Sequence, residues 1–391
     1  MDRRPETLSP DTPFLTDPSA QRVCAMLESA GYQAYFVGGC VRNAVIGAPV
    51  SDIDIATDAR PAAVVKLARS DGVKAVPTGI DHGTVTLVID GIPFEVTTFR
   101  RDVETDGRRA VVAFSDTMVE DARRRDFTMN AIYADARGVI HDPVDGLRDA
   151  RAGRVRFIDD ATQRIAEDYL RILRFFRFSA WYGDPALGWD PEALAAISAG
   201  LHGLATLSAE RVGAEMLKLL AAPDPAPAVG VMAQTGVLNA LLPGGDPQFI
   251  APLVHFEGQA NMGPDPYARL AALGGDDVVS RLRLSRKGQK RLEAIRTMAG
   301  TARGPRALGH LVGAEAAVGA MLLRAAMALG DLPHGWMDAI SDGARTEFPV
   351  RAADLPDLDG PTLGQRLKSL KQDWLASDLT LSREALLQRS Q

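Results

Sequence analysis

The sequence predicts an α+β protein, in which a mixed-sheet N-terminal domain is followed by a long part made only of helices. Three observations predict this class. Runs rich in β-branched residues and broken by glycine turns lie before about residue 155, apolar residues recur at helical spacing beyond about 160, and Pro/Gly-rich loops separate those later segments. At 391 residues the chain is too long for one ordinary core, so several domains are expected.

The N-terminal part alternates helices and strands. Residues 19–30 carry Val23, Met26 and Leu27 at helical spacing, and Gly31 ends this helix. The run AYFVGG predicts a buried strand that enters a turn, and VRNAVIG predicts a helix that stops near Gly47. The runs IDIAT, HGTVTLVID and IPFEVTTF then predict strands.

The C-terminal part predicts helices throughout. Segments such as RIAEDYLRILRFFRFSAWYG and SAERVGAEMLKLLAA place apolar residues on one helical face, and loops such as PDPAPAVG and LPGGDP separate them. The tail from about 345 to 391 is less periodic and is expected to be helical. The sequence contains no internal repeat.

The composition excludes several classes of protein. No apolar run approaches the roughly 18 residues of a membrane span, and the N-terminus lacks the apolar core of a secretory signal. The two cysteines, Cys24 and Cys40, argue against a disulfide framework or zinc site, so a reducing cytoplasm is expected. The net charge is −6, so a polyanion would have to be held by a local basic patch.

The stretch GGCVRNAVIGAPVSDIDIAT predicts a site for a metal–triphosphate. Side chains alternate across a strand, so Asp52 and Asp54 are expected on one face, where a cation such as Mg²⁺ would relieve their repulsion. Gly38 and Gly39 stand where a strand turns into a helix, a natural phosphate cradle, with Arg42 one turn on. Either motif alone is ordinary, the first as a solvated strand end and the second as a turn. Their joint spacing favours the functional interpretation.

The pattern GGxVRxxxxGxxxxDxDxxT resembles the signature of class II CCA-adding tRNA nucleotidyltransferases and the related bacterial poly(A) polymerases. The resemblance continues through RDFTMNAIYA (125–134), DPVDGLRDARAGRVRFI (142–158) and RIAEDYLRILRFFRF (164–178), and more weakly through 207–220. It implies a polymerase-β-like nucleotidyltransferase head over residues 1–155, a helical neck over 156–222, and a helical body and tail over 223–391. It covers about 35–220 in ordered blocks.

The resemblance assigns the catalytic centre. Asp52 and Asp54 would hold two Mg²⁺ ions, one acting on an RNA 3′-hydroxyl and the other on the triphosphate. Glu95, in the strand IPFEVTTF, is the candidate third acid, although a structural role is equally compatible with its position.

The block RRRDF (Arg123 to Phe127) resembles the family's second motif. Arg125 would clamp the triphosphate, because guanidinium groups bind phosphate oxygens bidentately. Asp126 and Asn130 are expected on one helix face, where they would contact the nucleotide and its ribose. The alternative is a solvated basic helix start.

The block EDYLR predicts base selection. Asp168 and Arg171, expected three residues apart on one helix, would offer an acceptor and a donor. This polarity matches the amino group and adjacent ring nitrogen of cytosine and of adenine, and it mismatches uracil and guanine. The resemblance implies the same role, whereas spacing alone would fit an ordinary helix salt bridge.

Further positions follow from the same resemblance. Arg174 and Arg177 continue the stripe of Arg171 and are expected to make further nucleotide contacts. The charged segment 100–114, centred on Gly107, is similar to the flexible loop that this family uses when it switches from C to A addition, or it is a simple linker. The chain departs from the family at Asn43, where Asp is usual, and at Tyr169, where proline is usual.

The partners implied are the tRNA 3′ end, CTP and ATP, with no membrane; the sequence leaves the oligomeric state open. The densest basic segment, RLRLSRKGQKRLEAIR (281–296), has seven basic residues against one glutamate. Arg286, Lys287 and Lys290 are its candidates for tRNA contact, and a merely solvated helix is the alternative.

The sequence therefore predicts a CCA-adding nucleotidyltransferase. The alternatives are a bacterial poly(A) polymerase, an enzyme that adds only A or only CC, and a non-catalytic nucleotide-binding regulator. The pI near 5.6 and the lack of a long basic C-terminal extension argue against the poly(A) polymerase. Retention of both Asp52 and Asp54 argues against the regulator.

Overall fold

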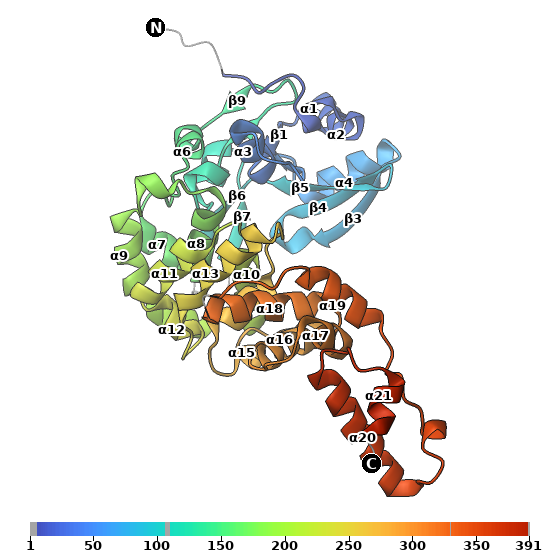
Figure 1. Ribbon diagram of the computed structural model, residues 1–391. Helices are drawn as coiled ribbons and strands as arrows, with labels where there is room; N and C mark the ends of the chain where they lie inside the picture. The colour runs from blue at the N-terminus through green and yellow to red at the C-terminus, as the bar shows by residue number, and fades with distance from the viewer. Residues whose placement is uncertain (1–5, 106–109, 329, 390–391) are drawn as a thin grey trace. The chain divides into compact units, whose positions relative to one another are not determined.

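The computed structural model describes residues 6–105, 110–328 and 330–389. The chain divides into two compact units, Met1–Leu207 and Ser208–Gln391, whose elements are labelled in Figure 1. The predicted division at 155 and 222 is finer than this one and stays a prediction.

The first unit is built on a seven-stranded mixed sheet. Its order is β3-β4-β5-β2-β1-β8-β9, with β1 Ala34–Val37, β2 Asp54–Thr57, β3 Lys74–Gly79, β4 Thr84–Ile89, β5 Ile92–Thr98, β8 Tyr133–Ala134 and β9 Ile140–His141. β2 and β5 run parallel, and the other neighbours are antiparallel. The three predicted β-rich runs are strands β2, β4 and β5.

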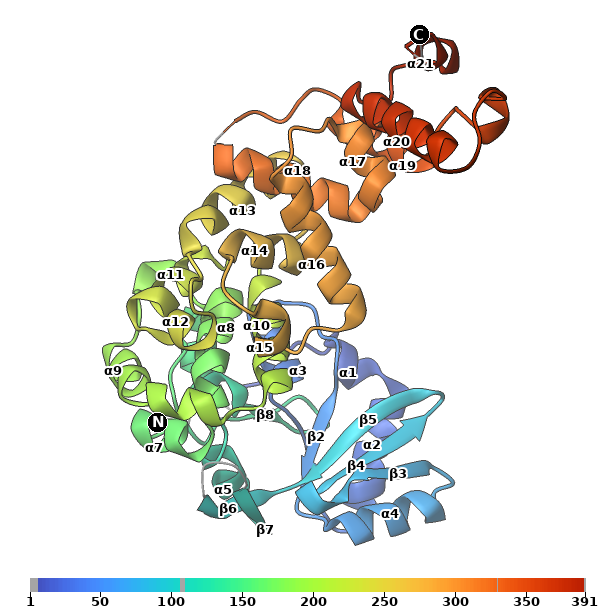
Figure 2. The same cartoon turned by 90° about the horizontal axis from the view of Figure 1, so that it is seen from below.

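Helices α2 (Pro18–Ser29) and α4 (Pro61–Ser70) contact each other and pack on the sheet (Figures 1 and 2). Asp17 caps α2 by accepting from the amides of Ser19 and Ala20, and Pro18 and Pro61 occupy first-turn positions, where a missing N–H costs nothing. The short helix α1 (Pro13–Thr16) precedes them, and η1 (Ile80–His82) joins β3 to β4.

A glycine turn joins the sheet to α3 (Gly39–Ile46). Gly38 has φ 72° and ψ −123°, a conformation essentially restricted to glycine, so the first glycine of the motif is required by the backbone. Gly47, in the left-handed region, ends α3 as predicted. Asp54 opens β2 seven residues later, whereas Asp52 lies in the segment just before the strand.

The prediction of a loop over 100–114 is wrong for the described part. β6 (Arg100–Thr105) and β7 (Ala110–Phe114) pair as a separate antiparallel hairpin. The two segments pair from Arg100 with Phe114 to Thr105 with Ala110, so backbone pairing replaces the expected loop. Residues 106–109, and with them the predicted centre Gly107, lie outside the described residues.

Two helix predictions near the site are also wrong. Helix α5 (Met118–Arg123) ends before Asp126, and only the 3₁₀ turn η2 (Thr128–Asn130) follows, because Phe127 bridges to Phe157 in extended conformation. Asp168, with φ −156° and ψ 104°, separates α7 (Ala161–Glu167) from α8 (Leu170–Tyr182). The unit is completed by α6 (Gly146–Ala152), η3 (Pro185–Leu187), α9 (Pro191–Ala199) and η4 (Leu201–Thr206).

Every named element of the second unit's described residues is helical, as predicted for the C-terminal part. They are α10 Ala209–Leu220, α11 Ala226–Gln234, α12 Val237–Leu241, η5 Pro247–Phe249, α13 Ile250–Gln259, α14 Pro266–Leu273, α15 Val278–Arg281, α16 Arg286–Ala299, α17 Pro305–Val312, α18 Ala314–Ala328, α19 Trp336–Arg345, η6 Ala352–Asp354, α20 Gly360–Ala376 and α21 Arg383–Gln388. The tail has its own apolar cluster around Trp374, Leu370 and Leu386.

Candidate active site

The predicted acids meet at the start of β2. Asp54 is the register partner of Glu95 on the parallel strand β5. Burial and the charge of Glu95 raise the pKa of Asp54 from 3.8 to about 6; the charge of Arg125 opposes this rise, and that of Asp52 adds to it. Two carboxylates and one guanidinium therefore act electrostatically on Asp54. Because β2 begins at Asp54, Asp52 is not held beside it by the predicted alternation along one strand.

The donor set fits a divalent cation that is shared with a ligand. Within the described part of the chain, no group of three His, Cys, Asp or Glu side chains is arranged to hold a metal alone. Mg²⁺ is commonly bound by one or two carboxylates together with water and substrate phosphates, which suits the pair Asp52 and Asp54. The roles of these two residues and of Glu95 stay predictions.

Arg125 is held in place by a buried carboxylate that the sequence analysis missed. Asp121 on α5 is 1% exposed, and it accepts from Arg125 Nη2 at 3.1 Å and from the Tyr133 hydroxyl at 2.8 Å. Arg124 forms a second ion pair with the same carboxylate. The four-residue spacing of Asp121 and Arg125 was the available signal, although α5 ends at Arg123.

Arg125 also borders the glycine turn. A Cβ built on Gly38 would lie 3.4 Å from Arg125 Nη1, so the guanidinium covers the turn beside Asp54. The Gly38 amide donates to the Ile132 carbonyl at 3.2 Å, which leaves Gly39, the first residue of α3, as the glycine whose amide has no acceptor within its own helix. The phosphate-binding roles of these residues stay predictions.

Asp126 and Asn130 are in contact, although not through a helix. Asn130 Nδ2 donates to Asp126 Oδ1 at 3.0 Å, and Arg174 Nε on α8 donates to Asp126 Oδ2 at 2.6 Å. Burial alone would raise the pKa of Asp126, but the Arg174 charge and these hydrogen bonds lower it. The predicted nucleotide contacts Asp126 and Arg174 are thus paired with each other.

Arg42 is more deeply engaged than a simple phosphate ligand. It is 5% exposed. Its guanidinium donates to Asn130 Oδ1 at 2.5 Å, to Asn43 Oδ1 at 2.9 and 3.1 Å, and to the Tyr182 hydroxyl at 2.8 Å. It also lies 3.9 Å from the centre of the Tyr182 ring. No local sequence signal pointed to Tyr182, which lies 140 residues away.

The base-selecting residues lie at the junction of α7 and α8. Asp168 follows α7 as its C-cap residue, and its Oδ1 accepts at 3.1 Å from the amide of Leu170, the first residue of α8. Arg171 forms its ion pair with Glu167 at 2.5 Å, not with Asp168. Because the backbone of Asp168 is not helical, the prediction that Asp168 and Arg171 share one helix face is wrong. The two residues are still close at the junction, since the Arg171 amide donates to the Asp168 carbonyl.

Glu167 is a second residue that the sequence analysis missed. Its carboxylate pairs with Arg164 as well as with Arg171. Arg171 also donates to the carbonyls of Arg164 and Arg124, both at 2.9 Å. These bonds use three of the five guanidinium N–H groups, so among the described residues Nε–H and one Nη2–H have no hydrogen-bond acceptor. Farther along α8, Arg177 lies over the Phe178 ring at 4.4 Å.

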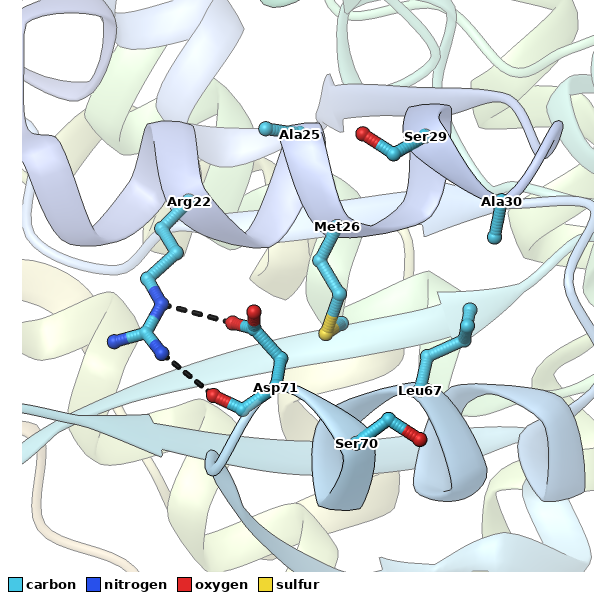
Figure 3. A pocket seen from close by; sticks show the side chains of 8 residues that line it. All are labelled: Arg22, Ala25, Met26, Ser29, Ala30, Leu67, Ser70 and Asp71. Atoms are coloured by element: carbon cyan, nitrogen blue, oxygen red, sulfur yellow. Dashed lines mark hydrogen bonds and ion pairs between the residues drawn. The ribbon is translucent and has the colours of Figure 1, made fainter.

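A separate cavity of about 410 Å³ lies between α2 and α4 (Figure 3). Met26 and Leu67 line it, and the ion pair between Arg22 and Asp71 crosses one end, as the dashed lines show. None of the predicted site residues lines this cavity.

The basic segment in the second unit is only partly available. Arg291 pairs with Asp265, and Arg296 donates to the Gly274 carbonyl. Arg286, Lys287 and Lys290 are exposed on α16, and each lacks an ion-pair partner among the described residues.

Two family models match the chain. "Poly A polymerase head domain" matches residues 34–156, and "Probable RNA and SrmB- binding site of polymerase A" matches residues 189–249. The solved Bacillus stearothermophilus CCA-adding enzyme in complex with CTP aligns over 96% of this chain and 98% of its own, with TM-score 0.73 and 30% identity. The chain belongs to the family of CCA-adding enzymes and poly(A) polymerases. This family generally uses divalent metal ions.

Curated relatives agree with this membership. The CCA-adding enzyme of Geobacillus thermodenitrificans is 42% identical over 57% of this chain and 54% of its own length. The human mitochondrial CCA tRNA nucleotidyltransferase 1 is 38% identical over 54% of this chain and 49% of its own. The chain thus spans about half the length of the curated relatives it matches.

A Thermotoga maritima CCA-adding enzyme complexed with tRNA aligns with TM-score 0.67 over 98% of both chains, at 18% identity, and is similar in fold. The predicted fold class, a mixed-sheet head followed by helices, is confirmed by these likenesses. Within residues 6–105, 110–328 and 330–389, no helix has the length and apolar character of a bilayer-spanning segment.

Proposed function

We propose that this chain is a template-independent RNA nucleotidyltransferase that adds C, C and A to the 3′ end of tRNA from CTP and ATP and releases pyrophosphate. The observation that carries the proposal is the charge cluster at β2, where the charges of Asp52, Glu95 and Arg125 all act on Asp54. Arg125 also borders the Gly38 turn. Its support is the alignment to the CTP complex over nearly the whole of both chains.

In the proposed mechanism, Asp52 and Asp54 hold Mg²⁺, which when bound lowers the pKa of the RNA 3′-hydroxyl and neutralises the triphosphate. Arg125, oriented by Asp121 and Tyr133, adds positive charge where the leaving pyrophosphate develops negative charge. Glu95 is proposed to assist as a third acid. Gly38 and Gly39 let the backbone approach the phosphates closely.

Base selection is proposed for Asp168 and Arg171. The Asp168 carboxylate would accept from the amino group of cytosine or adenine, and an available N–H of Arg171 would donate to the neighbouring ring nitrogen. Uracil and guanine would instead leave buried charges unpaired, which costs several kcal/mol. Asp126 and Asn130 would contact the nucleotide, Arg174 and Arg177 would line its path, and Arg42 would support the triphosphate region.

The partner and the division of labour belong to the same proposal. Residues 1–155 would form the catalytic head, 156–222 the neck, and 223–391 the tRNA-binding body and tail, with Arg286, Lys287 and Lys290 contacting the RNA backbone. A cytoplasmic location is supported by the two cysteines, both buried and unpaired.

The test is incorporation with each nucleotide separately. The purified protein is incubated with tRNA that lacks its CCA end, Mg²⁺ and one NTP at a time, then with CTP and ATP together. A CCA-adding enzyme adds C from CTP alone, completes the end with both and stops after three residues. The Asp54→Ala variant is the inactive control.

The name of the matched head model favours one second candidate, a poly(A) polymerase. That enzyme would extend unrelated RNA with many A residues from ATP alone. Growth limited to C or to a single A would indicate a partial enzyme, and nucleotide binding without incorporation would indicate a regulator. Each of the three results would replace the proposed function.

A further inference from the structure

The Asn43 side chain lies between two groups of opposite polarity. Its Oδ1 accepts from Arg42 Nε at 3.1 Å and from Arg42 Nη2 at 2.9 Å, while its Nδ2 donates to the Pro49 carbonyl at 2.7 Å. The Asn43 carbonyl also accepts from the Ala48 amide at 2.9 Å. One residue thus ties the end of α3 to the segment that leads into Asp52 and Asp54.

An amide suits both neighbours of position 43 in this chain, although the family usually has aspartate there. A guanidinium only donates hydrogen bonds, and a carbonyl only accepts them, so the linking side chain must accept on one side and donate on the other. An ionised aspartate in this position would still accept from Arg42, but it would place negative charge against the Pro49 carbonyl.

Arg42 carries the connection onward to α8 by two routes. The first is its hydrogen bond to the Tyr182 hydroxyl. The second runs from Arg42 to Asn130, from Asn130 to Asp126, and from Asp126 to Arg174. The bonds of Arg42 use four of its five N–H groups, which is the pattern of a structural junction more than of a free phosphate ligand.

We propose that Asn43 and Arg42 are positioning residues that hold the segment bearing Asp52 and Asp54 in register with α8. Asn43 is the two-sided link, and Arg42 is the buried junction. The inference rests on the proposed function only in assigning metal ligation to that segment and base selection to the start of α8. It makes the geometry of the carboxylates depend on contacts made by a helix far away in sequence.

Three variants separate the steps of this connection. Asn43→Asp keeps the acceptor for Arg42 and removes the donor to Pro49, Asn43→Ala removes both, and Tyr182→Phe removes only the hydroxyl that Arg42 contacts on α8. The matched control is Gln21→Glu, because Gln21 Nε2 makes the same kind of amide-to-carbonyl bond, to Ala136 at 3.1 Å, outside this network.

The first readout is amide hydrogen exchange in the free protein at Ala48, whose N–H donates to the Asn43 carbonyl, and across β2, whose residues pair with β1 and β5. Loss of the Asn43 side-chain bonds is expected to speed exchange at these amides by about 5- to 10-fold in Asn43→Ala, less in Asn43→Asp, and measurably in Tyr182→Phe. Exchange in Gln21→Glu should match the wild type. Wild-type exchange at these amides in Asn43→Ala or in Tyr182→Phe would overturn the proposal.

The second readout is the split between kcat and KM. Misplaced carboxylates should lower kcat about 10-fold or more in Asn43→Ala and raise the Mg²⁺ concentration for half-maximal rate, with the KM for CTP changed less than about 2-fold. Asn43→Asp, which carries the residue usual in the family, should lose less. An unchanged kcat would contradict the positioning role. If the wild type incorporates no nucleotide while the exchange rates change as expected, the proposed function fails and the positioning role stands.

Discussion

At the scale of single residues, the site is a place where the protein tolerates electrostatic strain. Asp54 is largely buried beside Glu95 and near Asp52, and its pKa is raised to about 6. Arg125 offsets part of this repulsion but is itself committed to Asp121. A carboxylate in this position is stabilised by a bound cation and destabilised without one.

Asp54→Asn should therefore inactivate the protein and stabilise it. The folded state binds a proton at Asp54 more tightly than the unfolded chain does, so stability falls as pH rises from about 4 through 6. The change of pKa from 3.8 to about 6 corresponds to at most about 3 kcal/mol. Without divalent ions, the Tm of Asp54→Asn should exceed that of the wild type by a few degrees at pH 7.5, since about 1 kcal/mol is worth roughly 2 °C in a chain of this size.

The control for this prediction is the pH itself. At pH 4.5 the wild-type Asp54 is mostly protonated, so the difference in Tm should shrink. Differential scanning calorimetry at the two pH values, with and without Mg²⁺, makes the measurement. An equal Tm for the two proteins at pH 7.5, or nucleotide incorporation by the variant, would contradict the assignment of Asp54.

Asp121 presents the opposite case, a buried charge that is fully paired. Burial alone would raise its pKa, but the charges of Arg125 and Arg124 and the Tyr133 hydrogen bond lower it well below its usual range. Its contribution to stability is therefore present above about pH 4 and is lost as the pH falls below that value.

Asp121→Asn should leave two partly buried arginines without their counter-charge. We expect a loss of about 3–5 kcal/mol in the free energy of unfolding, measured by urea denaturation at pH 7. The KM for CTP should rise as well, because Arg125 loses its orientation. Asp71→Asn is the matched control: the Arg22–Asp71 pair is about half exposed (Figure 3) and should cost less than about 1 kcal/mol. Equal losses in the two variants would refute the special role of Asp121.

At the scale of elements, the junction between α7 and α8 sets the chemistry. The apolar spacing of RIAEDYLRILRFF fits one continuous helix, and this pattern led to the wrong backbone at Asp168. The physical reason for the break is local competition: the Asp168 carboxylate accepts from the Leu170 amide two residues on, a local side-chain-to-backbone bond that competes with helical backbone pairing. Tertiary packing adds to it, since the Tyr169 ring fills the space next to Gly203.

The contacts at this junction lead to a specific test of nucleotide selection. Asp168→Asn should relax the preference for CTP and ATP over UTP, because an amide can donate to uracil O4 while it also accepts. The gain should be partial, since Arg171 would still oppose the uracil N3–H. Arg171→Ala should weaken incorporation of every nucleotide. The measurement is single-nucleotide extension with the four NTPs separately.

Asp160→Asn provides the matched control for that test. Asp160 caps α7 by accepting from the Gln163 amide at 2.7 Å, and asparagine caps a helix about as well as aspartate. Asp160→Asn should keep both rate and specificity. If Asp168→Asn also keeps the wild-type rate and specificity, the Asp168 side chain only supports the start of α8 through the Leu170 amide. Other residues would then select the base.

At the scale of the whole molecule, much of the architecture could be predicted from the sequence. The side-chain contacts between residues distant in sequence could not. Alternating β-branched residues predicted β4 and β5, and the paired glycines predicted the turn before α3, because these signals are local. Asp121, Glu167 and Tyr182 were missed. Their roles depend on which side chains the fold brings together, and the bond between Arg42 and Tyr182 joins residues 140 positions apart.

The chain has a net charge of −6, so the proposed binding of tRNA depends on where positive side chains are exposed. Several arginines of the first unit are paired with buried acids, among them Arg125 and Arg174. Arg286, Lys287 and Lys290, in contrast, stand exposed on α16. Changing all three to Ala should raise the KM for tRNA about 10-fold near 100 mM salt, and it should reduce the slope of log affinity against log salt by about 2 to 3, because fewer counterions are released.

The control is a triple variant with the same change of charge, in which Lys66, Arg69 and Lys74 become Ala; these residues are exposed on and after α4. This variant should bind tRNA with the wild-type salt slope. The KM for CTP should stay unchanged in both proteins, since neither set includes a residue that is proposed to contact the nucleotide. An equal loss of tRNA affinity in both triple variants would indicate that binding responds to total charge. Unchanged tRNA affinity in the α16 variant would show that α16 is only a solvated helix.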